Sequence, residues 1–251
     1  AERHPLRYVE SPGLRAPKAN ARDAKKLWKK LSRAAGLPRL IHRQMWHMTL
    51  PQVPFRALPG VRALNRRLGR WLVRRALHHL GFERPLLWFV VPHVAALAGQ
   101  LDERGLVYYC IDDYASLPDV DRREIRRLDE ALARRADQVF VASRALLEAK
   151  QPLNPHTAYS PHGVDVELFG QALDPALPPA DGAAHLRHPV IGFFGLLEAW
   201  VDLELIAHLA RSRPAWTFLL IGRVAVDVST LRALPNILLP GAQRYETLPR
   251  W

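Results

Sequence analysis

The sequence predicts an α/β protein built from two doubly wound, parallel-sheet domains. Short apolar runs rich in Val, Ile, Leu and Phe alternate with helix-like segments from residue 85 onward. A proline-rich stretch with little apolar periodicity, residues 171–188, interrupts the alternation once, after which it begins again. Strands that alternate with helices pair in parallel through right-handed crossovers. We therefore expect two Rossmann-like domains, residues 1–170 and 189–251, joined by a linker at 171–188.

The first domain contains the longer series of expected elements. Its strands are predicted at residues 6–9, 86–91, 106–111, 137–142 and 157–160. Its helices are predicted at residues 61–80, 94–101, 121–135 and 144–150. Ser143 is a good N-cap for the last of these helices, because its hydroxyl can accept a hydrogen bond from a free backbone N–H.

The second domain repeats the alternation on a shorter scale. Strands are predicted at residues 189–194, 216–221 and 236–239, with a helix at 201–211 and a short helix or turn at 231–234. This is the start of a second parallel sheet.

Composition excludes several classes of protein. The chain has 251 residues, 49% of them hydrophobic, which excludes intrinsic disorder. Its single cysteine, Cys110, cannot form a disulfide within the chain or a cysteine-rich zinc site, and is most simply a small core residue. The net charge of +12 resides in residues 1–110, which carry +15 against −3 for residues 111–251. The basicity is therefore a local feature.

Two basic segments account for much of this charge. One surrounds Trp28, and the other is the predicted helix 61–80, in which arginines fill the positions between a helical series of apolar residues. Such a helix either lies on an anionic membrane or packs on the domain with its basic face in water. No segment is expected to span a membrane, since the longest uncharged run contains Pro92 and His93.

In the first domain, polar residues follow two of the predicted strands. Open parallel sheets bind ligands at the carboxyl ends of their strands. His93 could be a base or an acceptor ligand there, or a half-buried residue that begins the next helix. Asp112, beside Asp113, could bind sugar hydroxyls, or it could form a turn before the next helix. Neither has neighbours that suggest a metal site, so we expect none.

In the second domain, glycines mark the strand ends. Gly192 and Gly195 bracket the end of the first strand, and Gly222 with Arg223 repeats the pattern one strand later. Glycines at this position let backbone N–H groups approach a phosphate, and an arginine can clamp it. Between the domains, His162, Gly163 and Asp165 form a candidate hinge, in which Gly163 is expected to supply a turn with positive φ.

Several of these segments together resemble a known family. In the first domain they are YYCIDDY at 108–114, ADQVFVAS at 136–143 and PHGVD at 161–165. In the second they are VIGFFG at 190–195, FLLIG at 218–222, LPNI at 234–237 and YETLP at 245–249. Their order resembles that of retaining, family-four GT-B glycosyltransferases, in which Asn-Gly-Val-Asp commonly precedes the interdomain linker. Here His162 replaces the Asn.

The resemblance implies a transferase that takes a sugar from a nucleotide-sugar donor. The diphosphate would lie near Gly195 and Arg223, and the acceptor near His93 and Asp112. The acceptor would be a polysaccharide or a lipid-linked glycan of the cell envelope. The leaving phosphate would accept the proton, and no metal or cofactor is expected. The enzyme would be cytoplasmic, at an anionic inner membrane surface.

The resemblance also implies how much of a complete family member this sequence covers. Family members have a first strand with a glycine-rich acceptor loop, and a later Glu-x7-Glu stretch that contacts the donor. The first would precede the segment with which this sequence starts, and the sequence ends before the second could occur. We therefore expect an internal part of a longer protein, with both GT-B domains incomplete.

Two other functions remain open at this point. A GT-B-fold sugar-nucleotide epimerase would share the donor-domain pattern. A non-enzymatic module could use the basic segment to bind a membrane surface. Nucleic acid is not an expected partner, because no stacking platform or recognition motif accompanies the charge.

Overall fold

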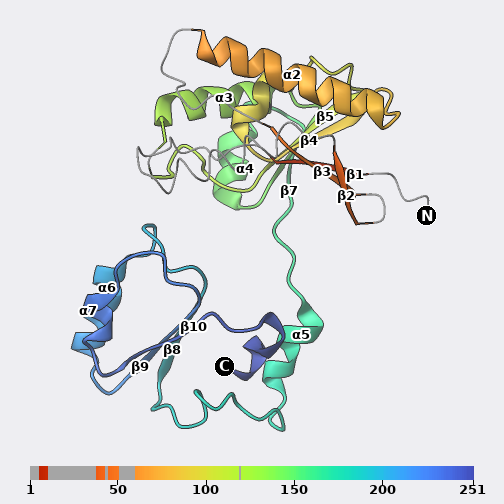
Figure 1. Cartoon of the computed structure of the whole chain (residues 1–251). Coiled ribbons are helices and arrows are strands. Elements are labelled where there is room, and N and C mark those ends of the chain that lie inside the picture. The colour runs from red at the N-terminus through yellow and green to blue at the C-terminus, as the bar shows by residue number, and fades with distance from the viewer. Residues whose placement is uncertain (1–5, 11–37, 43–44, 51–59, 119) are drawn as a thin grey trace. The chain divides into compact units, whose positions relative to one another are not determined.

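A computed structural model describes residues 6–10, 38–42, 45–50, 60–118 and 120–251 (Figure 1). The chain divides into two compact units, Ala1–His162 and Gly163–Trp251. The basic segment around Trp28 lies outside the described residues. Each unit contains its own parallel sheet, which confirms the predicted α/β class.

The first unit begins with a small three-stranded sheet. Strand β1, Leu6–Glu10, runs parallel to β3, Met45–Thr49, and β2, Arg39–His42, pairs with the other edge of β3 in the antiparallel direction. Only β1 corresponds to a predicted strand. Met48, near the end of β3, and Leu50, just after it, are buried in the main core of the unit.

The main sheet of the first unit has four parallel strands in the order β4-β5-β6-β7. They are Leu86–Phe89, Gly105–Cys110, Gln138–Val141 and Thr157–Tyr159. The connecting helices η1, α3 and α4 are Pro92–Leu97, Arg122–Arg135 and Arg144–Lys150. Because each strand lies beside the preceding one, right-handed crossovers place all three helices on one face of the sheet.

Local capping explains where two of these helices begin. The side chain of Asp121 accepts a hydrogen bond from Glu124 N at the start of α3, and Ser143 accepts one from Leu146 N at the start of α4. Both starts are as predicted. The predicted helix 94–101 is instead the 3-10 helix η1, which ends before Gly99, where φ is +70°.

The two faces of the main sheet differ. Leu87 and Phe89 are buried against the helices, together with Val73 and Ala76 of helix α2, Val61–His79. Their neighbour Trp88 points to the other face and is 54% exposed. It stacks on Phe140, with ring centroids 5.8 Å apart. This second face of the main sheet therefore carries an exposed indole stacked on another aromatic ring.

A polar network lies within the core on the helix side. The hydroxyl of Tyr108 donates to Asp129 Oδ1 over 2.5 Å, and Lys150 forms an ion pair with the other oxygen of that carboxylate. Tyr108 and Lys150 are buried, and burial raises the pKa of the Tyr108 hydroxyl well above its usual value. The network links β5, α3 and α4.

The second unit is a three-stranded parallel sheet in the order β10-β9-β8. The strands are Val190–Phe194 (β8), Thr217–Ile221 (β9) and Ile237–Gly241 (β10). The crossover helices are α6, Leu203–Ser212, and α7, Ser229–Arg232. Shorter helices complete the unit: α5, Val166–Gly170, η2, Gln171–Leu173, and η3, Tyr245–Arg250.

The boundary between the units differs from the expected one. Residues 163–170, expected in the first domain, and the expected linker 171–188 both belong to the second unit. Phe169 of α5 lies edge-on to Tyr245 of η3, with ring centroids 5.7 Å apart. Arg250 donates through Nε to Pro178 O over 3.0 Å and accepts from Ala180 N over 2.7 Å. These contacts attach the proline-rich stretch to η3.

An asparagine in each unit joins a helix end to a later strand. Asn154, before β7, donates through Nδ2 to the carbonyls of Ala133 and Ala136 at the end of α3. Asn236, before β10, donates to the carbonyls of Ala210 and Arg213 at the end of α6 and to that of Trp216. The last carbonyls of a helix have no partner within it, so both amides stabilise the helix end.

Candidate functional site

A cavity of about 310 Å³ lies at the carboxyl ends of the three strands of the second unit. It is lined by residues that follow or end β8, β9 and β10, with one residue from η3: Phe194, Gly195, Leu196, Ile221, Gly222, Arg223, Ala242, Gln243 and Leu248. Three of the predicted donor-site residues, Gly195, Gly222 and Arg223, are among them. This edge is where parallel sheets bind ligands.

Two glycines bring the ends of β8 and β9 into direct backbone contact. At Gly222, φ is +147°, and a Cβ atom there would lie 1.6 Å from the carbonyl oxygen of Gly195. No side chain fits in that space. The floor of the cavity between Gly195 and Gly222 is therefore bare peptide backbone.

The N–H groups of these glycines do not have the role expected of them. Gly195 N donates to Ile221 O over 2.9 Å, and Gly222 N donates to Gly241 O over 3.0 Å. They extend the sheet ladder, so neither is free to bind a phosphate. The next residues, Leu196 and Arg223, have N–H groups that make no hydrogen bond with any described residue. These are the backbone donors that remain at the cavity.

Arg223 supplies the positive charge of the cavity. Its side chain is exposed, and it forms no ion pair within the described part of the chain. By contrast, the N-terminus of α6 offers little to an anion, because Asp202 accepts from Leu205 N there and Glu204 lies in the first turn. Any phosphate at this edge would depend on Arg223 and the nearby N–H groups.

Gly192 lies apart from the other glycines. It pairs with Leu219 in the middle of β8, and it does not line the cavity. A Cβ atom there would have nothing within 4 Å. Gln243 and Leu248 line the cavity but were not singled out from the sequence, although Leu248 lies in the YETLP segment.

The predicted acceptor-side residues lie at the carboxyl ends of neighbouring strands. His93 is half-buried in η1 after β4, and Asp112 is exposed after β5. The two loops are joined by Tyr114, whose hydroxyl donates to Val90 O over 2.8 Å. Burial raises the pKa of Tyr114, so the hydroxyl stays protonated and keeps donating. Sequence reasoning missed Tyr114, although it directly follows the two aspartates.

The three candidate hinge residues have distinct local roles. The division between the units falls between His162 and Gly163. The ring of His162 lies edge-on to Tyr109, with centroids 6.3 Å apart. Asp165 caps α5 by accepting from Leu168 N over 2.9 Å. The expectation that Gly163 supplies a positive φ is wrong: Gly163 is not among the residues with positive φ, and its surroundings are open.

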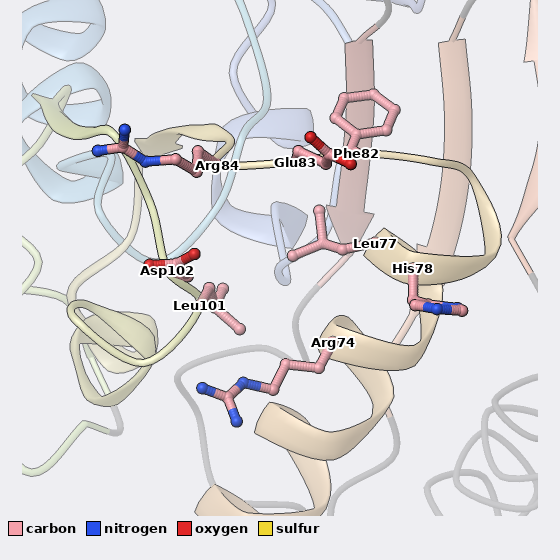
Figure 2. Close-up of a pocket in the computed structure, with 8 residues that line it drawn as sticks. All are labelled: Arg74, Leu77, His78, Phe82, Glu83, Arg84, Leu101 and Asp102. Carbon is pink, nitrogen blue, oxygen red and sulfur yellow. The ribbon is translucent and has the colours of Figure 1, made fainter.

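A second hollow, of about 360 Å³, lies at the opposite edge of the main sheet of the first unit (Figure 2). Its walls are the end of α2 with residues 82–84, and Leu101 with Asp102. Arg84 and Asp102 precede β4 and β5, so this hollow is at the amino ends of the strands. It is not the edge at which parallel sheets bind ligands.

The described residues contain neither a cluster of metal ligands nor a helix suited to cross a membrane. Within these ranges, no group of three or more His, Cys, Asp or Glu side chains could hold a metal ion. Within the same ranges, no helix combines the length and the apolar character that crossing a membrane requires.

The chain has two units, each with a parallel sheet, and the second has a cavity lined by glycines and Arg223 at the carboxyl ends of its strands. These features are those of the GT-B class of fold. Solved structures confirm this. Sucrose-phosphate synthase from Thermosynechococcus elongatus matches with a TM-score of 0.62 at 16% identity, over 98% of this chain and 72% of that one. Anabaena HepE, in complex with UDP, matches with a TM-score of 0.56 at 18% identity, over 98% of this chain and 71% of that one.

A third structure, an Escherichia coli trehalose-6-phosphate protein bound with UDP-2-fluoro glucose, has a TM-score of 0.58 at 12% identity. It covers 97% of this chain and 75% of that one. These likenesses establish the fold.

Sequence comparison identifies a relative. No family model matches the chain. A Bacillus subtilis (strain 168) protein, provisionally named the teichuronic acid biosynthesis glycosyltransferase TuaH, is 28% identical over 187 residues, 67% of this chain. The match spans 46% of that relative, less than half its length. The chain is thus a GT-B-fold homologue of a glycosyltransferase, and the resemblance predicted from the sequence is confirmed.

Proposed function

We propose that this chain is part of a glycosyltransferase that moves a sugar from a nucleotide-sugar donor to a glycan or lipid-linked acceptor of the cell envelope. The relative named for teichuronic acid biosynthesis supports an envelope glycan as the acceptor class. The UDP held by HepE supports a nucleoside diphosphate as the leaving group. The observation that carries the proposal is the cavity at the carboxyl ends of β8, β9 and β10.

The residues of this cavity suit a departing diphosphate. Transfer breaks the bond between the sugar C1 and the phosphate oxygen and forms a bond between C1 and the acceptor oxygen. The negative charge that develops on the diphosphate would be stabilised by the Arg223 guanidinium and by the N–H groups of Leu196 and Arg223. The acceptor proton would pass to the leaving phosphate, and we propose that the transfer uses no metal or cofactor.

The acceptor would bind on the first unit. His93 would form a hydrogen bond with its hydroxyl, and Asp112 would accept a hydrogen bond from a neighbouring hydroxyl. Tyr114, which ties the two loops through Val90 O, would hold the spacing between these side chains. We further propose a cytoplasmic enzyme at the inner membrane surface, with no nucleic-acid partner.

Calorimetric titration of the full chain with UDP, GDP and ADP tests the donor site. We expect at least one nucleotide to bind, and Arg223→Ala to weaken it about tenfold or more, the usual loss for a charged hydrogen bond. Arg232→Ala is the matched control, because Arg232 is an exposed arginine of the same unit that does not line the cavity. Absence of binding by all three nucleotides, or equal losses in both variants, would refute the donor site.

Product analysis then distinguishes transfer from epimerisation. A transferase releases the nucleoside diphosphate only when acceptor is present and forms a new glycoside. Accumulation of an epimerised sugar without any acceptor would instead identify the epimerase alternative.

A further inference from the structure

We propose that the outward face of α2 binds an anionic lipid bilayer through an apolar ridge flanked by arginines. The ridge consists of Leu64, Leu68 and Trp71. The inference is independent of the proposed transfer reaction, because it concerns a different surface and its test requires no nucleotide. In its partner it rests on the membrane location proposed above, and it adds the surface through which the protein makes that contact.

The ridge lies on the side of α2 that faces away from the core. Val73 and Ala76 are buried and pack on the main core, and Gly69 is buried beside them. At i, i+4 and i+7 along the helix, residues Leu64, Leu68 and Trp71 share one face. Leu64 is 52% exposed and Trp71 is 55% exposed, although helix faces in water are normally polar.

The charge on α2 has a single sign. Its 19 residues, VRALNRRLGRWLVRRALHH, include arginines and two histidines but no acidic residue. Arg67 and Arg75 are exposed and adjoin the ridge, and neither forms an ion pair within the described ranges. The guanidinium of Arg75 lies 5.5 Å from the ring centre of Trp71. Apolar residues bordered by exposed arginines are typical of helices that lie in a membrane interface.

Two other arginines of α2 form hydrogen bonds with Gln100. Arg70 donates through Nη1 to Gln100 Oε1 over 2.8 Å, and Arg74 donates through Nε to Gln100 O over 2.9 Å. Figure 2 shows Arg74 at the edge of the hollow, with its side chain directed to the Leu101 side and away from His78. These two arginines fix α2 to the rest of the unit, so the ridge is held on a rigid support.

Helix α3 shows that an arginine-rich composition does not by itself produce this arrangement. Its sequence, RREIRRLDEALARR, is equally rich in arginine but contains three acidic residues. Arg127 pairs with Glu124 and Arg134 with Glu130. None of the large apolar side chains of α3 is exposed. Helix α3 therefore has a mixed-charge surface, whereas α2 combines exposed apolar area with charge of one sign.

This combination favours lipid over nucleic acid. A phosphate backbone would engage Arg67 and Arg75 but would leave the leucines of the ridge in water. A bilayer interface accepts both, since Trp and Leu enter the region below the headgroups and arginines bind anionic headgroups.

Flotation of the full chain with lipid vesicles tests the proposal. We expect binding to vesicles of phosphatidylcholine mixed with phosphatidylglycerol, weaker binding at high salt, and little binding to phosphatidylcholine alone. Each arginine near an anionic surface contributes about 1 kcal/mol, so Arg67→Gln with Arg75→Gln should weaken binding roughly thirtyfold. Trp71→Ala should weaken it several-fold.

Two matched controls make the test specific. Arg123→Gln with Arg126→Gln removes two exposed arginines from α3, and Trp88→Ala removes the exposed indole of the main sheet. Both should bind as the parent chain does. Circular dichroism verifies that every variant is folded.

The proposal is overturned if anionic lipid gives no advantage, if the α3 pair loses as much affinity as the α2 pair, or if Trp88→Ala weakens binding and Trp71→Ala does not. It is also overturned if duplex DNA binds more tightly than the vesicles and loses affinity in the α2 pair.

Discussion

Replacing Gly222 by alanine should destabilise the second unit and disrupt the candidate donor site. The new Cβ would lie 1.6 Å from Gly195 O and 2.7 Å from Gly195 C, both backbone atoms that cannot rotate away. The ends of β8 and β9 would have to separate by well over about 1 Å to reach ordinary van der Waals contact. The hydrogen bond from Gly195 N to Ile221 O lies in the part that would move.

Two physical terms set the size of this effect. A non-glycine residue held at φ +147° costs about 1–3 kcal/mol, and overpacking a tight contact costs about 1–3 kcal/mol. Their sum is about 2–6 kcal/mol. A domain of this size loses roughly 4–8 °C in Tm per kcal/mol, so we expect a decrease of at least about 8 °C.

Differential scanning calorimetry of the full chain measures this. Each unit has its own hydrophobic core, so we expect two transitions, of which only the second unit's should shift. Gly192→Ala is the matched control, because nothing lies within 4 Å of its added Cβ, and it should change stability by less than about 0.5 kcal/mol. A Gly222→Ala chain as stable as the parent, or equal losses in both variants, would refute the argument.

Three other substitutions or treatments test features of the two cores. Burial raises the pKa of the Cys110 thiol above its usual value, so the thiol stays protonated at neutral pH. Labelling by iodoacetamide should therefore proceed only as fast as the first unit unfolds, and rapid labelling of the native chain would contradict this. Lys150→Met leaves the carboxylate of Asp129 without its ion-pair partner and should lower the free energy of unfolding, measured with urea, by about 3–5 kcal/mol. A decrease of less than about 1 kcal/mol would show that water reaches the carboxylate. Asn236→Ala removes the donor to three backbone carbonyls and should cost about 1–3 kcal/mol, with the loss confined to the calorimetric transition of the second unit.

Elements set by local signals were predictable from the sequence. Helix α4 begins where Ser143 predicted, because a capping hydroxyl acts within four residues of chain. The strands from β4 onward were found because each has a short apolar run, which is the pattern typical of parallel sheets. Strands β2 and β3 were missed, because their sequences RLIH and MWHMT include charged or polar residues and the pairing of β3 with β1 joins segments distant in the sequence.

The candidate site was only partly predictable, for the same reason. The sequence indicated which glycines end the strands, but it could not indicate that the N–H groups of Gly195 and Gly222 are used by Ile221 and Gly241. That depends on the register of three strands. The proline-rich composition of residues 171–188 likewise indicated a linker, while the hydrogen bonds of Arg250 that attach it to η3 involve residues about seventy positions away.

The face of the main sheet that carries Trp88 has a practical consequence for handling the protein. Trp88 is exposed there and lies against the rings of Phe140 and Tyr109, and exposed aromatic surface promotes self-association as concentration rises. Because side chains alternate along each strand, Leu87 and Phe89 point the other way into the core. The substitution Trp88→Lys would therefore change the solubility of the chain while leaving its core packing intact, so concentrated samples can be obtained by redesigning that face alone.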